Sequence, residues 1–214
     1  MSPRIGVCDY GVGNLHSVER ALVRAGAEPV ISGVPAELES CDGLVLPGVG
    51  AFVAAAEQLG RTGMDRFTLE FVRSGRPLLG VCLGYQLLFE HSDEGAGADG
   101  LGLIAGQVTR VDARGLKLPQ IGWNQIRRVR DTPLLDGVPD GTYVYFVHSY
   151  GATPDDEADA VAVTDYGATM VAAVQRGGVM GTQFHPEKSG AAGLRLYLNF
   201  VALCAASRAS AVAR

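Results

Sequence analysis

Long apolar runs are scarce in this sequence of 214 residues. Glycine, proline and charged residues interrupt the apolar segments, so we expect none to approach the roughly 20 residues that cross a bilayer. Residues 1–4 lead directly into a strand-like run at 5–8, without a charged leader, a long apolar segment or a cleavage site. We therefore expect a cytoplasmic protein with no membrane partner.

Positive charge is scarce as well. The chain has 18 Lys and Arg residues against 23 Asp and Glu residues, a net charge of -5, and its basic residues form no stripe. Binding to a phosphate backbone requires clustered positive charge. We therefore do not expect nucleic acid to be a ligand.

Cysteine is rare, and the cysteines are far apart: Cys8, Cys41, Cys82 and Cys204. They show no paired spacing of the kind that forms a disulfide framework or a zinc site. A reduced compartment suits them, and we expect no metal site. Most free cysteines are small buried hydrophobic residues, and this interpretation fits Cys8 in a strand and Cys204 in a helix.

The chain is long enough to bury one substantial core, and we expect a single domain over residues 1–214. Its first half alternates β-rich runs with helical patterns, and the predicted strands are 4–8, 29–31, 43–46 and 77–81. These strands should form a parallel sheet with helices on its faces. Apolar residues at helical spacing predict two of the helices: Leu15, Val18, Leu22 and Ala25, and then Met64, Phe67 and Phe71.

The second half has a different texture. A glycine-rich loop at 95–106 precedes β-leaning runs around Val108, Ile126, 143–147, Val161, Val171 and Val179. A last amphipathic helix is expected to pack on the sheet through Leu194, Leu198 and Val201.

A tight turn around Cys82 is the most specific local signal. Gly80-Val81-Cys82-Leu83-Gly84 lies where an apolar strand gives way to a helix, which is typical of a nucleophile elbow. Its glycines permit a crowded turn, and the helix N-terminus behind Cys82 favours the reactive thiolate. A buried structural cysteine remains the alternative for this motif taken alone.

The second signal is His185-Pro186-Glu187, directly after a strand-like run. Extended residues two apart share a side, so the carboxylate can fix the imidazole tautomer and stabilise its protonated form. The alternative is a surface histidine beside a solvated carboxylate. His148 is a rival base but lacks a carboxylate two residues on, and we expect His16 and His91 on helix surfaces.

The third signal is Pro47-Gly48-Val49-Gly50, a loop that should open at the same sheet edge. Such a loop can aim backbone N–H groups at a developing oxyanion, and glycine permits the backbone path. An ordinary strand-to-helix turn is the alternative, and the presence of Cys82 favours the functional interpretation.

A dinucleotide site is excluded at Gly11-Val12-Gly13-Asn14. The third glycine of the dinucleotide fingerprint is replaced by His16, and no acidic residue closes the second strand. We expect no cofactor.

The ordered motifs Pro-Gly-Val-Gly, Gly-Val-Cys-Leu-Gly-Tyr-Gln and Phe-His-Pro-Glu resemble the class I glutamine amidotransferase family. The resemblance implies a doubly wound α/β fold, with a mixed, mainly parallel sheet, flanking helices and a flavodoxin-like core. It implies a catalytic triad of Cys82, His185 and Glu187 that hydrolyses L-glutamine. It also implies an oxyanion hole at Gly48, Val49, Gly50 and Leu83, and a glutamine site formed by Gly50, Leu83, Gln86, Ser149 and Tyr150.

Further features resemble one branch of that family, the glutaminase subunits of imidazole glycerol phosphate synthases in histidine biosynthesis. They are Asp9-Tyr10-Gly11 with Asn14, Gly122-Trp123-Asn124, the segment 145–150, and His185-Pro186-Glu187-Lys188-Ser189-Gly190. Gln120-Ile121 departs from the His and Met common in that branch.

This second resemblance implies a heterodimer with a separate (β/α)8 cyclase subunit that receives the ammonia. The residues that would face the cyclase are Asn14, Trp123, Tyr145 and Lys188. Three alternatives stay open: a glutaminase of another synthase (anthranilate, aminodeoxychorismate or pyridoxal phosphate), a cysteine peptidase of the same fold class, and a homologue that binds without catalysis.

Overall fold

A computed structural model describes residues 2–212 of the chain. Its main sheet is built from β1 (Arg4–Cys8), β2 (Glu28–Ser32), β3 (Gly43–Leu46), β4 (Leu78–Val81), β8 (Gln120–Arg128), β9 (Thr142–His148), β11 (Ala160–Tyr166), β12 (Ala168–Arg176) and β13 (Val179–Thr182). The nine strands lie in the order β2-β1-β3-β4-β13-β12-β11-β8-β9. The first five are parallel to one another, and the other four continue the sheet in antiparallel pairs. The four strands predicted in the first half are confirmed, with ends shifted by one residue in β2 and β4.

A second, smaller sheet lies beside the first. It contains β5 (His91–Ser92), β6 (Ala98–Asp99), β7 (Gly106–Arg110) and β10 (Tyr150–Pro154), in the order β10-β7-β5-β6. Two of its strands fall in the segment 95–106 or at its end, where the sequence predicts a loop. Three 3-10 turns complete the connections: η1 (Pro133–Leu135), η2 (Glu157–Asp159) and η3 (Pro186–Lys188).

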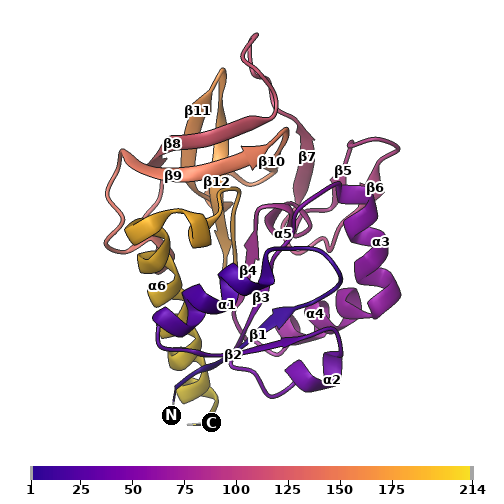
Figure 1. Cartoon of the computed structure of the whole chain (residues 1–214), viewed down its shortest axis with the longest axis vertical. Coiled ribbons are helices and arrows are strands. Elements are labelled where there is room, and N and C mark those ends of the chain that lie inside the picture. The colour runs from indigo at the N-terminus through magenta and orange to yellow at the C-terminus, as the bar shows by residue number, and fades with distance from the viewer. Residues whose placement is uncertain (1, 213–214) are drawn as a thin grey trace.

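Helices cover both faces of the parallel strands (Figure 1). On one face lie α1 (Leu15–Arg24) and α6 (Gly190–Val212), and on the other lie α2 (Pro35–Leu38), α3 (Phe52–Thr62) and α4 (Met64–Arg73). The short helix α5 (Leu83–Gln86) follows β4 directly. Each face has its own apolar core, because a sheet buried on both sides needs continuous apolar strands. The predicted doubly wound α/β fold is confirmed.

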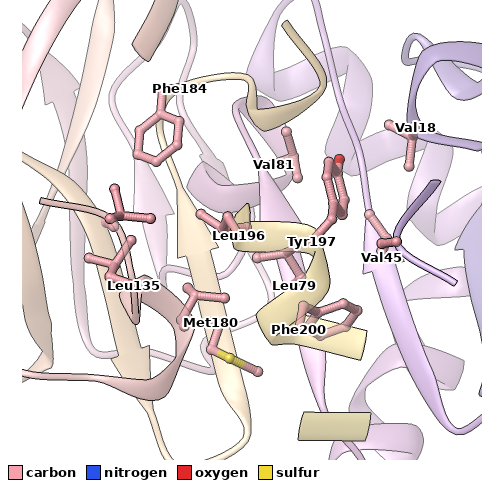
Figure 2. Close-up of a cluster of buried hydrophobic side chains, with 14 of the residues drawn as sticks. Val18, Val45, Leu79, Val81, Leu135, Met180, Phe184, Leu196, Tyr197 and Phe200 are labelled. Carbon is pink, nitrogen blue, oxygen red and sulfur yellow. The ribbon is translucent and has the colours of Figure 1, made fainter. Parts of the chain in front are cut away.

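Figure 2 shows the core beneath α6, where Leu196, Tyr197 and Phe200 pack against Leu79 and Met180 of the sheet. The buried face of α6 differs from the predicted one, since Leu198 is 37% exposed. A Cβ atom on Gly193 would collide with the carbonyl oxygen of Pro186. This backbone contact fixes how the helix is rotated, and apolar spacing alone does not reveal it.

The expectation that no apolar segment approaches the length needed to cross a bilayer is wrong. Residues 190–209 of α6 form a helical stretch of 20 residues with a mean hydropathy of 1.3, long and apolar enough by these measures to cross a membrane. The expectation counted glycine, proline and charged residues as interruptions, but the glycines and arginines of this segment do not break the helix. A core helix of a soluble protein has the same character, and α6 places Leu196, Tyr197, Phe200 and Cys204 in the core.

Candidate active site

The turn at Cys82 is tightly constrained. Cys82 has φ 55° and ψ −108°, a backbone conformation that side chains other than glycine rarely adopt. A Cβ atom on Gly80 would lie 2.7 Å from the Gly84 oxygen, and one on Gly84 would collide with the Leu46 oxygen. The Cys82 N–H donates to the Thr182 oxygen at 2.8 Å. The glycines are therefore required by contact, and the predicted elbow between β4 and α5 is present.

His185 and Glu187 form the expected pair. His185 Nδ1 lies 2.7 Å from Glu187 Oε1, and each side chain is 2% exposed. The His185 N–H donates to the Tyr145 oxygen, and the Ser189 hydroxyl donates to the His185 oxygen. Because the Glu187 carboxylate accepts a hydrogen bond from Nδ1, Nε2 is the nitrogen available for proton transfer. Nε2 has no hydrogen-bond partner among the described residues.

The charge on His185 is favoured by its neighbours. Burial opposes the imidazolium, but interactions with Cys82 and Glu187 outweigh it and raise the pKa of His185 to about 9. The ring is therefore protonated at neutral pH. This state suits a group that gives a proton to a leaving amine.

His148 lies in the same region but differs from His185. Its Nδ1 is 2.8 Å from the Tyr150 oxygen, and its Nε2 is 3.0 Å from Oε1 of Gln120. Burial lowers the pKa of His148 to about 4, so the ring stays neutral, with one N–H, which Nδ1 donates to the Tyr150 oxygen. This geometry supports the choice of His185 over His148 as the candidate base.

The other two histidines lie at the surface. His16 is exposed on α1, as predicted, with Nδ1 3.3 Å from Glu19. His91 lies in strand β5 rather than on a helix, and its Nδ1 is 2.9 Å from Asp99. No group of three or more metal-binding side chains is found within the described part of the chain.

The loop at 47–50 approaches the elbow closely. A Cβ atom on Gly48 would lie 2.7 Å from the Tyr10 hydroxyl and 2.9 Å from Leu83 Cβ, so only glycine fits. The Leu83 N–H, implied as an oxyanion donor, instead donates to the Gly48 oxygen at 3.3 Å. Gly50 has a φ of 102° and Val49 is exposed at the loop tip. One of the implied donors is therefore occupied in this conformation.

A cavity of about 240 Å³ joins these parts. Cys82, His185 and Val49 line it, and so do the residues implied for glutamine binding: Gly50, Leu83, Gln86, Ser149 and Tyr150. Glu94 also lines it, and its Oε2 accepts the Phe52 N–H at the start of α3 at 2.7 Å. No pattern in the sequence singles out Glu94, because a carboxylate beside a glycine-rich loop is typical of solvated charge.

The residues implied for a partner interface lie mostly together. The rings of Trp123 and Tyr145, on the adjacent strands β8 and β9, pack edge-to-face at 6.0 Å, and Lys188 Nζ is 5.5 Å from the Tyr145 ring centre. Trp123 is 55% exposed. Asn14 instead caps α1, where its side chain accepts the Ser17 N–H. Ile121 and Tyr143, which are not among the implied interface residues, are exposed on the same two strands.

Two kinds of relative match this chain. The protein named imidazole glycerol phosphate synthase subunit HisH of Methanosarcina mazei is 51% identical over 94% of this chain and 99% of its own. The protein of the same name from Geobacillus kaustophilus is 50% identical over 93% and 96%. Among solved structures, PurLQS from Thermotoga maritima superposes with a TM-score of 0.74 at 22% identity, covering 94% of this chain and 99% of the other. That structural likeness supports the fold alone.

A family model agrees with the motifs at Cys82 and His185. The model described as glutamine amidotransferase class-I matches residues 6–203. The matched range contains the elbow, the loop at 47–50 and the His185-Glu187 pair. This chain belongs to the class I glutamine amidotransferase family.

Proposed function

We propose that this chain is the glutaminase subunit of an imidazole glycerol phosphate synthase. It hydrolyses L-glutamine and passes ammonia to a separate (β/α)8 cyclase subunit that makes imidazole glycerol phosphate and AICAR in histidine biosynthesis. The observation that carries this proposal is the near 50% identity to subunits of that name over more than nine-tenths of both chains. The 214 residues act as one glutaminase domain in the cytoplasm.

Catalysis uses Cys82 and His185, which line the cavity, and Glu187, which is buried behind His185. The Cys82 thiolate adds to the carboxamide carbon, and the protonated His185 gives its Nε2 proton to the departing nitrogen, which leaves as ammonia. The glutamyl group then remains on Cys82 as a thioester. His185, now neutral, takes a proton from water as it attacks, and glutamate leaves while the Cys82 thiolate is restored beside a protonated His185. Glu187 holds Nδ1–H and so fixes the tautomer throughout.

Substrate recognition follows from the polar groups of the cavity. Glutamine carries an α-ammonium, and Glu94 places a carboxylate in the cavity lining. Gln86, Ser149 and Tyr150 line the same space, and Gly50 and Leu83 bound it on the loop side. A small cavity of this volume suits a single amino acid.

The oxyanion hole requires a rearrangement. Backbone N–H groups of Gly48, Val49, Gly50 and Leu83 must face the oxygen that becomes negative, yet the Leu83 N–H is bonded to the Gly48 oxygen. Docking of the cyclase with its acceptor ligand turns the loop and frees this donor. The isolated chain is therefore nearly inactive.

The cyclase docks on the face that carries Trp123, Tyr145 and Lys188, with Asn14 at its margin. Trp123 is exposed and packs against the half-buried ring of Tyr145, and aromatic residues are enriched in interface cores. Ammonia must travel unprotonated to remain a nucleophile, so this interface excludes bulk water.

A paired assay tests the function. Cys82→Ala, assembled with the cyclase, should lose glutamine-dependent product formation by about 10⁴-fold or more, because the attacking atom is absent. Product formation from ammonium salts should remain. Cys41→Ala, which removes a buried thiol outside the cavity, is the matched control and should keep both activities. Survival of glutamine turnover in Cys82→Ala would show the mechanism to be wrong.

A further inference from the structure

Gln183 is a buried polar residue beside the cavity that the proposed mechanism does not use. It follows strand β13, its side chain is fully buried, and its backbone N–H donates to the Ala172 oxygen at 2.9 Å. Buried side-chain amides are retained where their hydrogen-bonding groups have partners. Both ends of the Gln183 amide have such partners.

One backbone carbonyl sets the direction of this network. The Tyr150 oxygen can only accept, and it lies 2.8 Å from Nε2 of Gln86, which therefore donates to it. The same Nε2 donates to Oε1 of Gln183 at 3.0 Å. The Gln86 nitrogen is thereby fully engaged on the protein side, and the Gln86 oxygen is left for the cavity that this residue lines.

The other end of the Gln183 amide meets the nucleophile. Because Oε1 accepts from Gln86, Nε2 is turned towards Cys82 and lies 3.9 Å from its sulfur. The sulfur is also 3.8 Å from the Val147 oxygen, which can accept from a thiol but repels a thiolate. An N–H donor therefore favours the thiolate, and the carbonyl favours the thiol.

We propose that Gln183 is a positioning residue for glutamine hydrolysis: its side-chain oxygen holds Gln86 with an acceptor facing the substrate, while its nitrogen donates to the Cys82 sulfur. The inference rests on the proposed function for its consequences in turnover. The amide thus couples substrate orientation to the state of the nucleophile.

Two substitutions separate the two ends of the amide. Gln183→Glu keeps the shape and an acceptor for Gln86 but removes the donor and brings negative charge to the sulfur. We expect kcat for glutamine to fall about 10-fold or more with KM within about 2-fold. Gln183→Met removes both groups, releases Gln86 and should raise KM by about 5-fold or more as well as lower kcat.

Alkylation of Cys82 by iodoacetamide, without substrate or partner, provides the second measurement. Both variants should move the midpoint of the alkylation rate against pH to higher pH, and Gln183→Glu should move it further. A purely structural role for Gln183 would leave this profile unchanged in any variant that folds. Thermal unfolding and ammonia-dependent synthesis with the cyclase report whether each variant folds and assembles.

The outcomes are distinct from those of the functional proposal. If the wild-type complex fails to hydrolyse glutamine, the proposed function is wrong, yet the alkylation profile still tests the contact between Gln183 and the sulfur. If folded Gln183→Met keeps the wild-type KM, kcat and alkylation profile, the inference is overturned. If that variant does not fold, the isosteric Gln183→Glu decides, and a wild-type profile in it overturns the inference equally.

Discussion

The two walls of the cavity differ in how completely this chain assembles them. On the nucleophile wall, Cys82 is held at a strained φ by packed glycines, and His185 is fixed by Glu187 at 2.7 Å. On the loop wall, residues 47–50, the Gly48 oxygen accepts the Leu83 N–H and Val49 is exposed. One wall is built from buried side chains with fixed partners, and the other is a surface loop with an occupied donor.

Under the proposed function, this difference explains how activity can depend on a partner that contributes no residue to the proposed triad. Attack and proton transfer require groups that the chain positions alone, whereas stabilisation of the oxyanion requires a donor that is engaged elsewhere. Loss of one oxyanion donor costs about 10²–10³ in kcat in serine proteases. In the proposed mechanism, the loop at 47–50 is therefore sufficient to keep the isolated chain nearly inactive.

Among the substitutions that test the two walls, Glu187→Gln should produce the largest effect, because it breaks the nucleophile wall. The amide removes the charge that stabilises the imidazolium and permits the wrong tautomer, so we expect kcat for glutamine to fall about 10²–10⁴-fold in the complex. Steady-state glutamate release measures it. Glu70→Gln, on the surface of α4 and outside the cavity, is the matched control and should keep wild-type turnover. Equal rates for the two variants would remove Glu187 from the mechanism.

The pH dependence of stability tests whether His185, on the nucleophile wall, is held in its charged form. The pKa of His185 is raised to about 9 in the folded protein from an ordinary 6.5, so its contribution is complete below pH 6.5 and is lost as pH rises through 9. We expect the wild type to lose about 3 kcal/mol over this range relative to His185→Gln. Denaturant unfolding at several pH values measures it, and parallel curves for both proteins would contradict the assignment.

The contribution of His148 to stability should change with pH in the opposite direction. Its pKa is lowered to about 4, so its contribution is present above pH 6.5 and is lost as pH falls towards 4. The comparison of wild type with His148→Gln in the acid range therefore separates the two histidines.

Trp123→Ala should have the smallest effect. It tests the proposed cyclase interface, where docking of the partner is proposed to rearrange the loop at 47–50. Removal of an exposed aromatic anchor should weaken cyclase binding by about 1–3 kcal/mol, with little change in the stability of the free chain. Titration calorimetry with the purified cyclase measures the affinity. Val34→Ala, another exposed apolar residue, is the control. An unchanged affinity in Trp123→Ala would place the interface elsewhere.

The sequence predicted the features that depend on neighbours in the chain. The four parallel strands are short apolar runs between turn residues, and the elbow depends on glycines two residues to each side of Cys82. The pairing of His185 with Glu187 is also local. Each of these patterns is complete within a few residues, which is why it could be read before the fold was known.

The features that the sequence missed depend on distant contacts. The hydrogen bond between Gln86 and Gln183 joins residues 97 apart in the chain, and the bond between the Phe52 N–H and Glu94 joins residues 42 apart. The rotation of α6 is set by the contact between Gly193 and the Pro186 backbone. Strands β5 and β6 have two residues each, too few to show the alternation of apolar and polar residues that predicts a strand. None of these has a local pattern, because each is fixed by packing between separate elements.

Glutamine turnover by the purified chain, measured alone and then with the cyclase and its acceptor nucleotide, tests the contrast between the two walls most directly. The proposed triad is already assembled and one proposed oxyanion donor is occupied, so turnover should rise by about 10²-fold or more when the liganded partner is added. Turnover by the chain alone at the rate of the liganded complex would contradict this account.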